Sequence, residues 1–258
     1  MARTRRASHG FTLLEIMLAM LVLGILVSGL AVPFATHLAM RRHEETRRIL
    51  EEARDALLGF AATHGRLPCP AIASSRGVES FAPGGDALNG NCSNFHDGLL
   101  PAAAIGLPAL DPEGFARDGW DSEANRIRYA VFGAGRTVGG VPNPMTRANG
   151  LQQATIAALG DSPGYLVICG VGSAVNASGC GPAANQLTRR AAFVLLSLGP
   201  SAAQRPGAGT DESRNLDGNG VFVSHEHSAV PGNEFDDYLT WVPVNVLVNR
   251  MISAGRLP

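Results

Sequence analysis

The stretch Gly10-Phe11-Thr12-Leu13-Leu14-Glu15 opens a long apolar run near the start of the chain. The 20 residues from 16 to 35 carry no charged side chain. A helix rises about 1.5 Å per residue, so a run of this length is long enough to cross the hydrocarbon core of a bilayer. The sequence therefore predicts a membrane-crossing helix with one carboxylate, Glu15, at its edge.

A basic leader, residues 1–10, precedes this run and contains Arg3, Arg5 and Arg6. A secretory signal has a shorter apolar stretch of about 7–15 residues, and its small-residue cleavage site follows that stretch. Here the small residue that suits processing, Gly10, comes before the apolar run. Cleavage at that point would remove the leader and keep the helix.

The motif at residues 10–15 resembles the class III signal of type IV pilins and of type II secretion pseudopilins, over roughly Arg5 to Ala35. The resemblance implies that a prepilin peptidase cuts after Gly10 and methylates the new amino terminus, Phe11. It also implies that Glu15 pairs with the amine of a neighbouring subunit inside a helix bundle, where opposite charges attract strongly. The alternative for Glu15 is a place among lipid headgroups, where a carboxylate costs little.

Beyond the apolar run, the pattern predicts that the helix continues to His64. Ile49, Ala53, Leu57 and either Phe60 or Ala61 recur at helical spacing and give it one apolar face. A kink or a locally unwound segment is expected near residues 29–33, because Pro33 cannot donate a backbone hydrogen bond. The expected organisation is a leader at 1–10, an assembly helix at 11–40, an amphipathic half at 41–65 and a periplasmic globular domain at 66–258.

The globular part is expected to be α+β, with a small antiparallel sheet packed on the long helix and connected by long loops. Short β-branched or aromatic segments bounded by turn residues predict strands at Ile127–Phe132, Tyr165–Cys169, Ala192–Leu198, Val221–Ser224 and Tyr238–Val242. A short helix is expected between Pro101 and Pro108, an exposed loop at 200–220, and a closing helix at Val244–Ala254.

Three later segments add to the resemblance to pseudopilin-like proteins. They are Gly65-Arg66-Leu67-Pro68-Cys69-Pro70, Asp118-Gly119-Trp120-Asp121 and Glu234-Phe235-Asp236-Asp237-Tyr238. The second segment departs from the related motif of major pseudopilins, because Asp121 stands where those proteins have glycine.

Four cysteines are present, and outside the cytoplasm they are expected to form disulfides. Three pairings are possible. Joining Cys169 to Cys180 and Cys69 to Cys92 closes the shortest loops. A zinc site is disfavoured, because the usual short spacing between paired cysteines is absent.

No enzymatic constellation is evident. Gly160-Asp161-Ser162-Pro163-Gly164 has the form of a hydrolase nucleophile elbow, but proline cannot supply the oxyanion-binding N–H. The histidines of His225-Glu226-His227 lack a third metal ligand. A weak calcium site is the one cofactor considered, since major pseudopilins often bind calcium in a late loop; its candidate ligands are Asp211, Asp217, Asn219, Asp236 and Asp237, with Glu212 nearby.

The sequence thus predicts a structural minor pilin or pseudopilin, not an enzyme. It would be held in the inner membrane by a single span and assembled into a type II secretion pseudopilus or a type IV pilus. The resemblance implies a prepilin peptidase, other pilins and an inner-membrane assembly platform with its ATPase as partners. A net charge of −1 gives no reason to expect nucleic-acid binding. The alternative is a membrane-anchored extracytoplasmic binding protein or adhesin that uses the same signal.

Overall fold

The computed structural model describes residues 12–162, 164–204 and 206–257, without the side chains of residues 26–36. The chain divides into two compact units, residues 1–43 and 44–258. Helix α1 (Leu13–His64) begins in the first unit and ends in the second. The predicted processing residues Gly10 and Phe11 lie outside the described residues.

Helix α1 begins directly after Thr12. The backbone N–H of Glu15 donates to the Thr12 hydroxyl oxygen at 3.3 Å, which is the geometry of an N-cap. The backbone stays helical through residues 29–33, so the predicted unwinding there is wrong. The loss of one backbone hydrogen bond at Pro33 does not end a helix of this length.

The membrane-crossing helix predicted at residues 16–35 is not found. Among the described residues, no helix is both long and apolar enough to cross a membrane. Within that run, side chains are described only for residues 16–25.

The second unit is built on a six-stranded sheet. Its strands are β1 (Gly98–Leu99), β2 (Arg128–Val131), β5 (Leu166–Cys169), β6 (Gln186–Ser197), β7 (Val221–Val223) and β8 (Tyr238–Pro243). The long strand β6 is central and pairs antiparallel with β2, β5 and β8. A separate hairpin joins β3 (Thr137–Val138) to β4 (Val141–Pro142).

The sheet differs from the predicted one in the pairing of β5 with β7. Strands β5 and β7 run parallel, whereas an entirely antiparallel sheet was expected. A parallel pair requires a long crossover, and β6 with the segment from 198 to 220 supplies it. Strand β6 also extends six residues before the predicted start at 192. Its early part contains the polar residues Thr188, Arg189 and Arg190, so the hydropathy pattern does not indicate a strand there.

Short helices complete this unit: α2 (Gly150–Gln153), α3 (Ile156–Asp161), α4 (Asp211–Arg214) and α5 (Val244–Ser253). The helix predicted between Pro101 and Pro108 is wrong, because the chain there forms turns. Gly106 has a φ of +76°, which ends the single turn that starts at Pro101. The predicted exposed loop at 200–220 contains α4 and buries Asp211 and Glu212.

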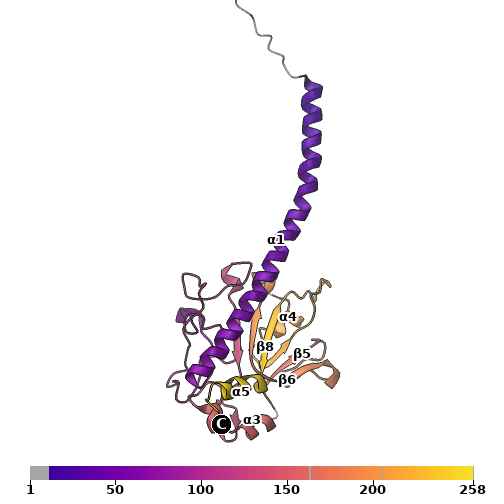
Figure 1. Ribbon diagram of the computed structural model, residues 1–258. Coiled ribbons are helices and arrows are strands. Elements are labelled where there is room, and N and C mark those ends of the chain that lie inside the picture. The colour runs from indigo at the N-terminus through magenta and orange to yellow at the C-terminus, as the bar shows by residue number, and fades with distance from the viewer. Residues whose placement is uncertain (1–11, 163, 205, 258) are drawn as a thin grey trace, which may run out of the picture. The chain divides into compact units, whose positions relative to one another are not determined.

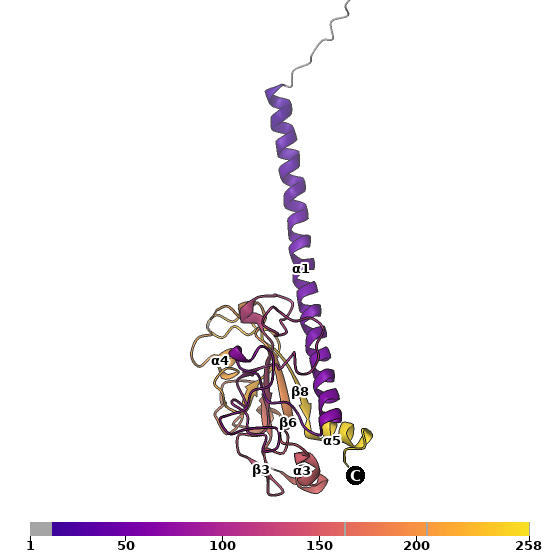
Figure 2. The ribbon, with the colours of Figure 1, turned by 90° about the vertical axis from the view of Figure 1, so that its left-hand side faces the viewer.

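Residues 44–64 of α1 pack on one face of the sheet, and α4 lies on the other side (Figures 1 and 2). Ala53, Leu57 and Ala61 are 0% exposed, which confirms the apolar face predicted for this part of the helix. Helix α5 places Leu247 and Met251 in the same core.

The Asp118–Asp121 turn binds this helix to the sheet. The buried Asp118 carboxylate accepts hydrogen bonds from the Ser197 hydroxyl of β6 at 2.6 Å and from the Asn125 amide at 2.9 Å. The next backbone N–H, that of Gly119, donates to Thr46 of α1 at 3.0 Å. This sequence segment therefore has a structural role at the junction of helix, turn and sheet.

Two disulfides join the expected partners. Cys69 is bonded to Cys92 and Cys169 to Cys180, each with a Cα–Cα distance of 5.3 Å. The first links the segment after α1 to the loop before β1. The second closes the loop that follows β5.

Candidate functional site

The start of α1 exposes its apolar side chains. Within the first unit, Leu13 and Leu14 are 78% and 79% exposed. The other large exposed apolar residues at this end are Ile16, Met17, Leu18, Met20, Leu21, Val22, Leu23 and Ile25. Large contiguous apolar surfaces mark sites that bind other proteins or lipid. Glu15 is exposed among them and is the one carboxylate of residues 12–43.

Thr12 is a functional residue that the sequence interpretation missed. Its hydroxyl caps the helix, and the signal for it is the pattern Thr-x-x-Glu at residues 12–15, which is typical of a capping box. The cap fixes where the helix that carries Glu15 begins.

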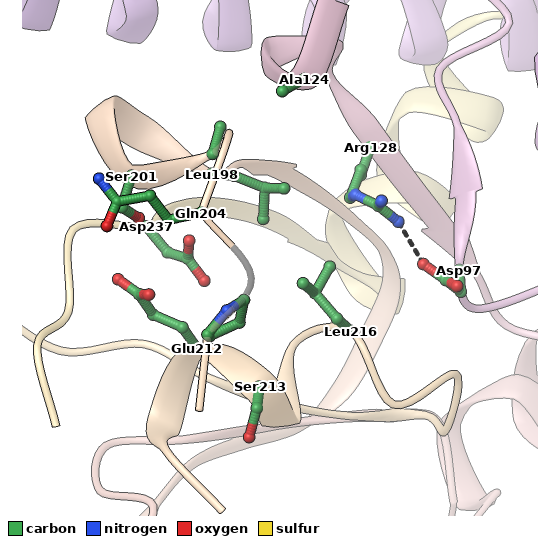
Figure 3. Close-up of a pocket in the computed structure, with 12 residues that line it drawn as sticks. Asp97, Ala124, Arg128, Leu198, Ser201, Gln204, Glu212, Ser213, Leu216 and Asp237 are labelled. Atoms are coloured by element: carbon green, nitrogen blue, oxygen red, sulfur yellow. Dashed lines mark hydrogen bonds and ion pairs between the residues drawn. The ribbon is translucent and has the colours of Figure 1, made fainter. Parts of the chain in front are cut away.

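The second unit contains a cavity of about 500 Å³ beside α4 (Figure 3), which we call the acidic cavity. Its lining comes from residues in or next to the ends of β1, β2, β6 and β8, from the turn before β2, and from the segment that runs before, through and just after α4. The lining residues are Asp97, Ala124, Arg128, Leu198, Ser201, Ala202, Gln204, Pro206, Glu212, Ser213, Leu216 and Asp237.

Two carboxyl groups that line the acidic cavity, those of Glu212 and Asp237, form a cluster with the nearby Asp236. Oxygen atoms of Glu212, Asp236 and Asp237 all lie within 4.8 Å of one another. The Glu212 carboxylate accepts the backbone N–H of Asp236 at 2.8 Å, and the Asn215 amide donates to Asp237 at 2.7 Å. Thr210 caps α4 through the N–H of Ser213, which fixes the helix that carries Glu212.

Burial governs the ionisation of these groups. Asp237 is buried, and desolvation raises its pKa to about 8, with the neighbouring Glu212 and Asp236 charges acting in the same direction. Desolvation also raises the pKa of Glu212. Near neutral pH, Asp237 therefore holds a proton in the folded chain.

The far side of the acidic cavity carries a matched pair of charges. The Arg128 guanidinium donates to the Asp97 carboxylate, as Figure 3 shows. Leu198 and Leu216 lie between this pair and the carboxyl group of Glu212. The cavity is thus acidic at one end and apolar in the middle, and at the other end the charges of Arg128 and Asp97 neutralise each other.

The predicted calcium ligands are only partly brought together. Asp236 and Asp237 meet, but their third partner is Glu212. Asp211 accepts from the Asn233 amide and lies 3.0 Å from His225 Nε2. Asp217 accepts hydrogen bonds from Asn219 within its own turn. Oxygen ligands suit a hard cation, so among the described residues the Glu212–Asp236–Asp237 group has the composition that could hold calcium.

The histidine motif at residues 225–227 and the serine motif at residues 160–164 have structural roles. His225 stacks on Phe235 with ring centroids 4.0 Å apart, and His227 meets the edge of Tyr238. They follow β7 and do not lie in a strand. Gly160 and Asp161 end α3, and Pro163 of the serine motif lies outside the described residues.

Comparison with known families gives one result. Residues 5–31 match the family model described as the prokaryotic N-terminal methylation motif. Comparisons with curated proteins and with solved structures give no match. The matched segment starts before α1 and ends within its first half, so it says nothing of residues 44–258. Residues 5–31 therefore carry a prepilin-type class III signal, as type IV pilins and pseudopilins do.

Proposed function

We propose that this chain is a structural filament subunit, made as a precursor and assembled through the first half of α1 as a minor pilin or pseudopilin. The observation that carries the proposal is the methylation motif at residues 5–31. Such a signal implies processing by a prepilin peptidase and assembly with other pilins. The role needs no catalytic group and no cofactor.

The exposed apolar surface of α1 supports this assignment. Leu13, Leu14 and Met17 are each at least 65% exposed, and such a surface is stable only when lipid or other helices cover it. In the proposed cycle, lipid of the inner membrane covers it in the precursor and neighbouring helices cover it in the filament. The apolar composition of residues 16–35 is the basis for the lipid-covered state.

Glu15 gives the assembly its register in this proposal. Its carboxylate is exposed on the apolar end of the helix, where burial without a partner would be costly. The amine created at Phe11 of an adjacent subunit supplies the opposite charge. An assembly platform and its ATPase would move the subunit from membrane to filament.

A membrane-anchored binding protein or adhesin is the second candidate. The acidic cavity favours it, because a purely structural subunit has no need of a cavity of about 500 Å³. The two functions differ in assembly. A filament subunit co-purifies with other pilins in a manner that depends on Glu15, whereas an anchored monomer does not.

Mass spectrometry of the membrane-extracted protein tests the processing step. We expect the mature chain to begin at N-methyl-Phe11, and Gly10→Val to leave the precursor uncut. Gly24→Val is the matched control, because Gly24 lies within α1 in open surroundings and should leave processing intact. A mature terminus beyond residue 35 would contradict the proposed function.

A further inference from the structure

The outer strands of the sheet in the second unit are protected in different ways. An edge strand presents unpaired N–H and C=O groups, and proteins normally cover such an edge or blunt it with charges and bulges. Beside β1, Ala71 exchanges two backbone hydrogen bonds with Leu99, each at 2.8 Å. Beside β7, the Asn215 side chain accepts from the N–H of Val223 at 2.8 Å and donates to its carbonyl oxygen at 3.1 Å.

The early part of β6 is protected by charge and by irregular pairing. Ala191 pairs with β5 on one edge and with Pro243 of β8 on the other, and the pairing with β8 ends there. Residues 186–190 therefore have an edge that no strand of the described chain covers. Arg189 and Arg190 are exposed on this stretch, and register shifts mark β-bulges in its pairing with β5. Both features discourage the addition of another strand.

Strand β8 lacks these protections. Its residues Tyr238–Pro243 carry no charge, and residues 238–242 pair with β6 without a register shift. Proline occurs only at the last position. Among the described residues, no strand other than β6 pairs with β8. A regular, uncharged edge of this kind is a template for pairing with another chain.

The register shows which backbone groups of β8 face outward. Val131 of β2 lies opposite Phe193 but donates its N–H away from β6, to the segment before β1. Residues of an antiparallel ladder bond alternately to one side and the other, so Phe193 bonds instead to Val242 of β8. The same alternation turns the N–H and C=O groups of Leu239 and Trp241 away from β6. Within the described chain, no hydrogen bond reaches these outward groups.

A groove of about 750 Å³, which we call the edge groove, adjoins the start of β8. Its walls are residues 237–240, residues 224–227 after β7, and Arg47, Leu50 and Glu51 of α1. None of these residues belongs to β6, so the groove lies on the outer side of β8. Figures 1 and 2 show β8 beside the second half of α1. Extended peptides bind proteins by adding a strand to an exposed edge, where their backbones supply the missing hydrogen bonds.

We propose that the outer edge of β8 binds an extended, uncharged segment of a partner protein as an added strand. The backbone of that segment bonds the outward groups of Leu239 and Trp241 and enters the edge groove. Because β8 itself is uncharged and includes aromatic and β-branched residues, the matching segment is rich in the same residue types.

A second copy of the chain suits this edge less well. Antiparallel pairing of two β8 edges about a two-fold axis would run the two copies of residues 44–64 in opposite directions. The proposed function requires subunits that leave one membrane in the same orientation. Only this choice of occupant rests on the proposed function, and the binding measurements do not depend on processing or on Glu15.

Calorimetric titration of the full-length protein in detergent micelles tests the proposal. The probe is an uncharged seven-residue peptide of alternating threonine and valine, N-methylated at every second residue so that one edge can pair and the other cannot. The control peptide has the same side chains and is N-methylated at every residue. We expect saturable binding of one probe per chain, and at least about tenfold weaker binding of the control. Equal affinity for the two peptides, or no binding of the probe, would overturn the proposal.

A pair of variants locates the site. Leu239→Pro removes one outward N–H, keeps the ladder with β6 and has a φ that suits an edge strand. It should weaken probe binding by about tenfold or more, because the ring also obstructs the incoming strand. Leu239→Val is the matched control that keeps the N–H, and circular dichroism checks that both variants fold. Equal binding by the two variants would contradict the assignment.

Hydrogen exchange of the unaltered chain gives a test that needs no variant. The amides of Leu239 and Trp241 should exchange faster than that of Thr240, which bonds to β6, and the probe should slow the first two. Exchange that the probe leaves unchanged would overturn the proposal. A parent chain that is dimeric in micelles, and monomeric as Leu239→Pro, would identify a second copy as the occupant and overturn the choice of partner.

Discussion

The hydroxyl oxygen of Thr46 accepts a hydrogen bond from the backbone N–H of Gly119 at 3.0 Å, and Thr46 is completely buried. The bond joins the second half of α1 to the turn that leads toward β2. Because the donor is a half-buried backbone N–H, removing its acceptor leaves it poorly satisfied, which costs more than the bond itself contributes.

Thr46→Val should therefore destabilise the protein by about 1–3 kcal/mol, although the side chain keeps its size. Chemical denaturation followed by circular dichroism measures the loss. Thr63→Val is the control on the same helix, because Thr63 is exposed and its hydroxyl bonds the backbone of its own helix. An equal loss in the two variants would show that the contact with Gly119 is unimportant.

Asp118→Asn should be more damaging. The Asp118 carboxylate accepts from Ser197, Asn125 and the backbone of Trp120, so each of its partners is a donor. An amide places its own N–H groups against some of these donors, and we expect a loss of about 3 kcal/mol. Asp121→Asn, at an exposed position in the same turn, should change the unfolding free energy by about 0.5 kcal/mol or less. Comparable losses in both variants would argue against the buried network.

Sequence reasoning located those parts of the fold that depend on local pattern. The amphipathic half of α1 and the closing helix α5 follow hydrophobic periodicity, and the cores of β2, β5, β7 and β8 follow short β-branched or aromatic segments bounded by turn residues. The parallel pairing of β5 with β7 depends instead on the path of a long connection, which no local pattern records. The early part of β6 escaped notice because Thr188, Arg189 and Arg190 are partly or fully exposed.

The candidate site likewise has one part that follows from local sequence and one part that depends on the tertiary fold. The prepilin-type signal is a contiguous motif, so it is readable from the sequence alone. The acidic cavity unites Asp97, Arg128, Leu198, Glu212 and Asp237, which are far apart in the chain. Glu212 joins Asp236 and Asp237 only because α4 lies beside the residues that lead into β8, and that placement is a property of the tertiary fold.

The protonated Asp237 predicts a dependence of stability on pH. Its pKa is about 8 in the folded chain, against an ordinary value of 3.8. Between these values the folded state holds one more proton than the unfolded state, so the unfolding free energy falls as pH rises from about 4 to about 8. The slope from this group is at most about 1.4 kcal/mol per pH unit.

Asp237→Asn should remove much of that slope, because the amide cannot ionise and its oxygen can still accept from Asn215. The variant should match the parent near pH 4 and be more stable near pH 9, as measured by denaturation at a series of pH values. Asp217→Asn, at an exposed position, should retain the slope. A parent protein whose stability rises between pH 5 and 8 would contradict the proposed ionisation.

The two disulfides should contribute similar amounts to stability. Cys169–Cys180 spans 11 positions and Cys69–Cys92 spans 23. By chain entropy, each link stabilises the fold by about 3 kcal/mol, with the longer loop slightly ahead. Denaturation of the Cys169→Ala/Cys180→Ala and Cys69→Ala/Cys92→Ala variants measures this. A stability unchanged by either double substitution would show that the corresponding link does not constrain the unfolded chain.

Glu15→Val tests the assembly mechanism at its most specific residue. The substitution makes the first turns of α1 more apolar, so membrane insertion should not suffer, and it leaves the predicted cleavage site after Gly10 unchanged. What is lost is the carboxylate that would meet the amine of an adjacent subunit. Recovery with partner pilins in a pull-down should therefore fall strongly, while the processed form accumulates to the parent level.

Glu44→Val is the matched control for this experiment, since Glu44 is an exposed glutamate further along the same helix. It should be recovered with partner pilins as well as the parent is. Glu15→Asp adds a sharper test, because it keeps the charge on a shorter side chain and should restore part of the assembly. If Glu15→Val were incorporated normally, the carboxylate would have no role in register, and α1 would assemble through its apolar surface alone.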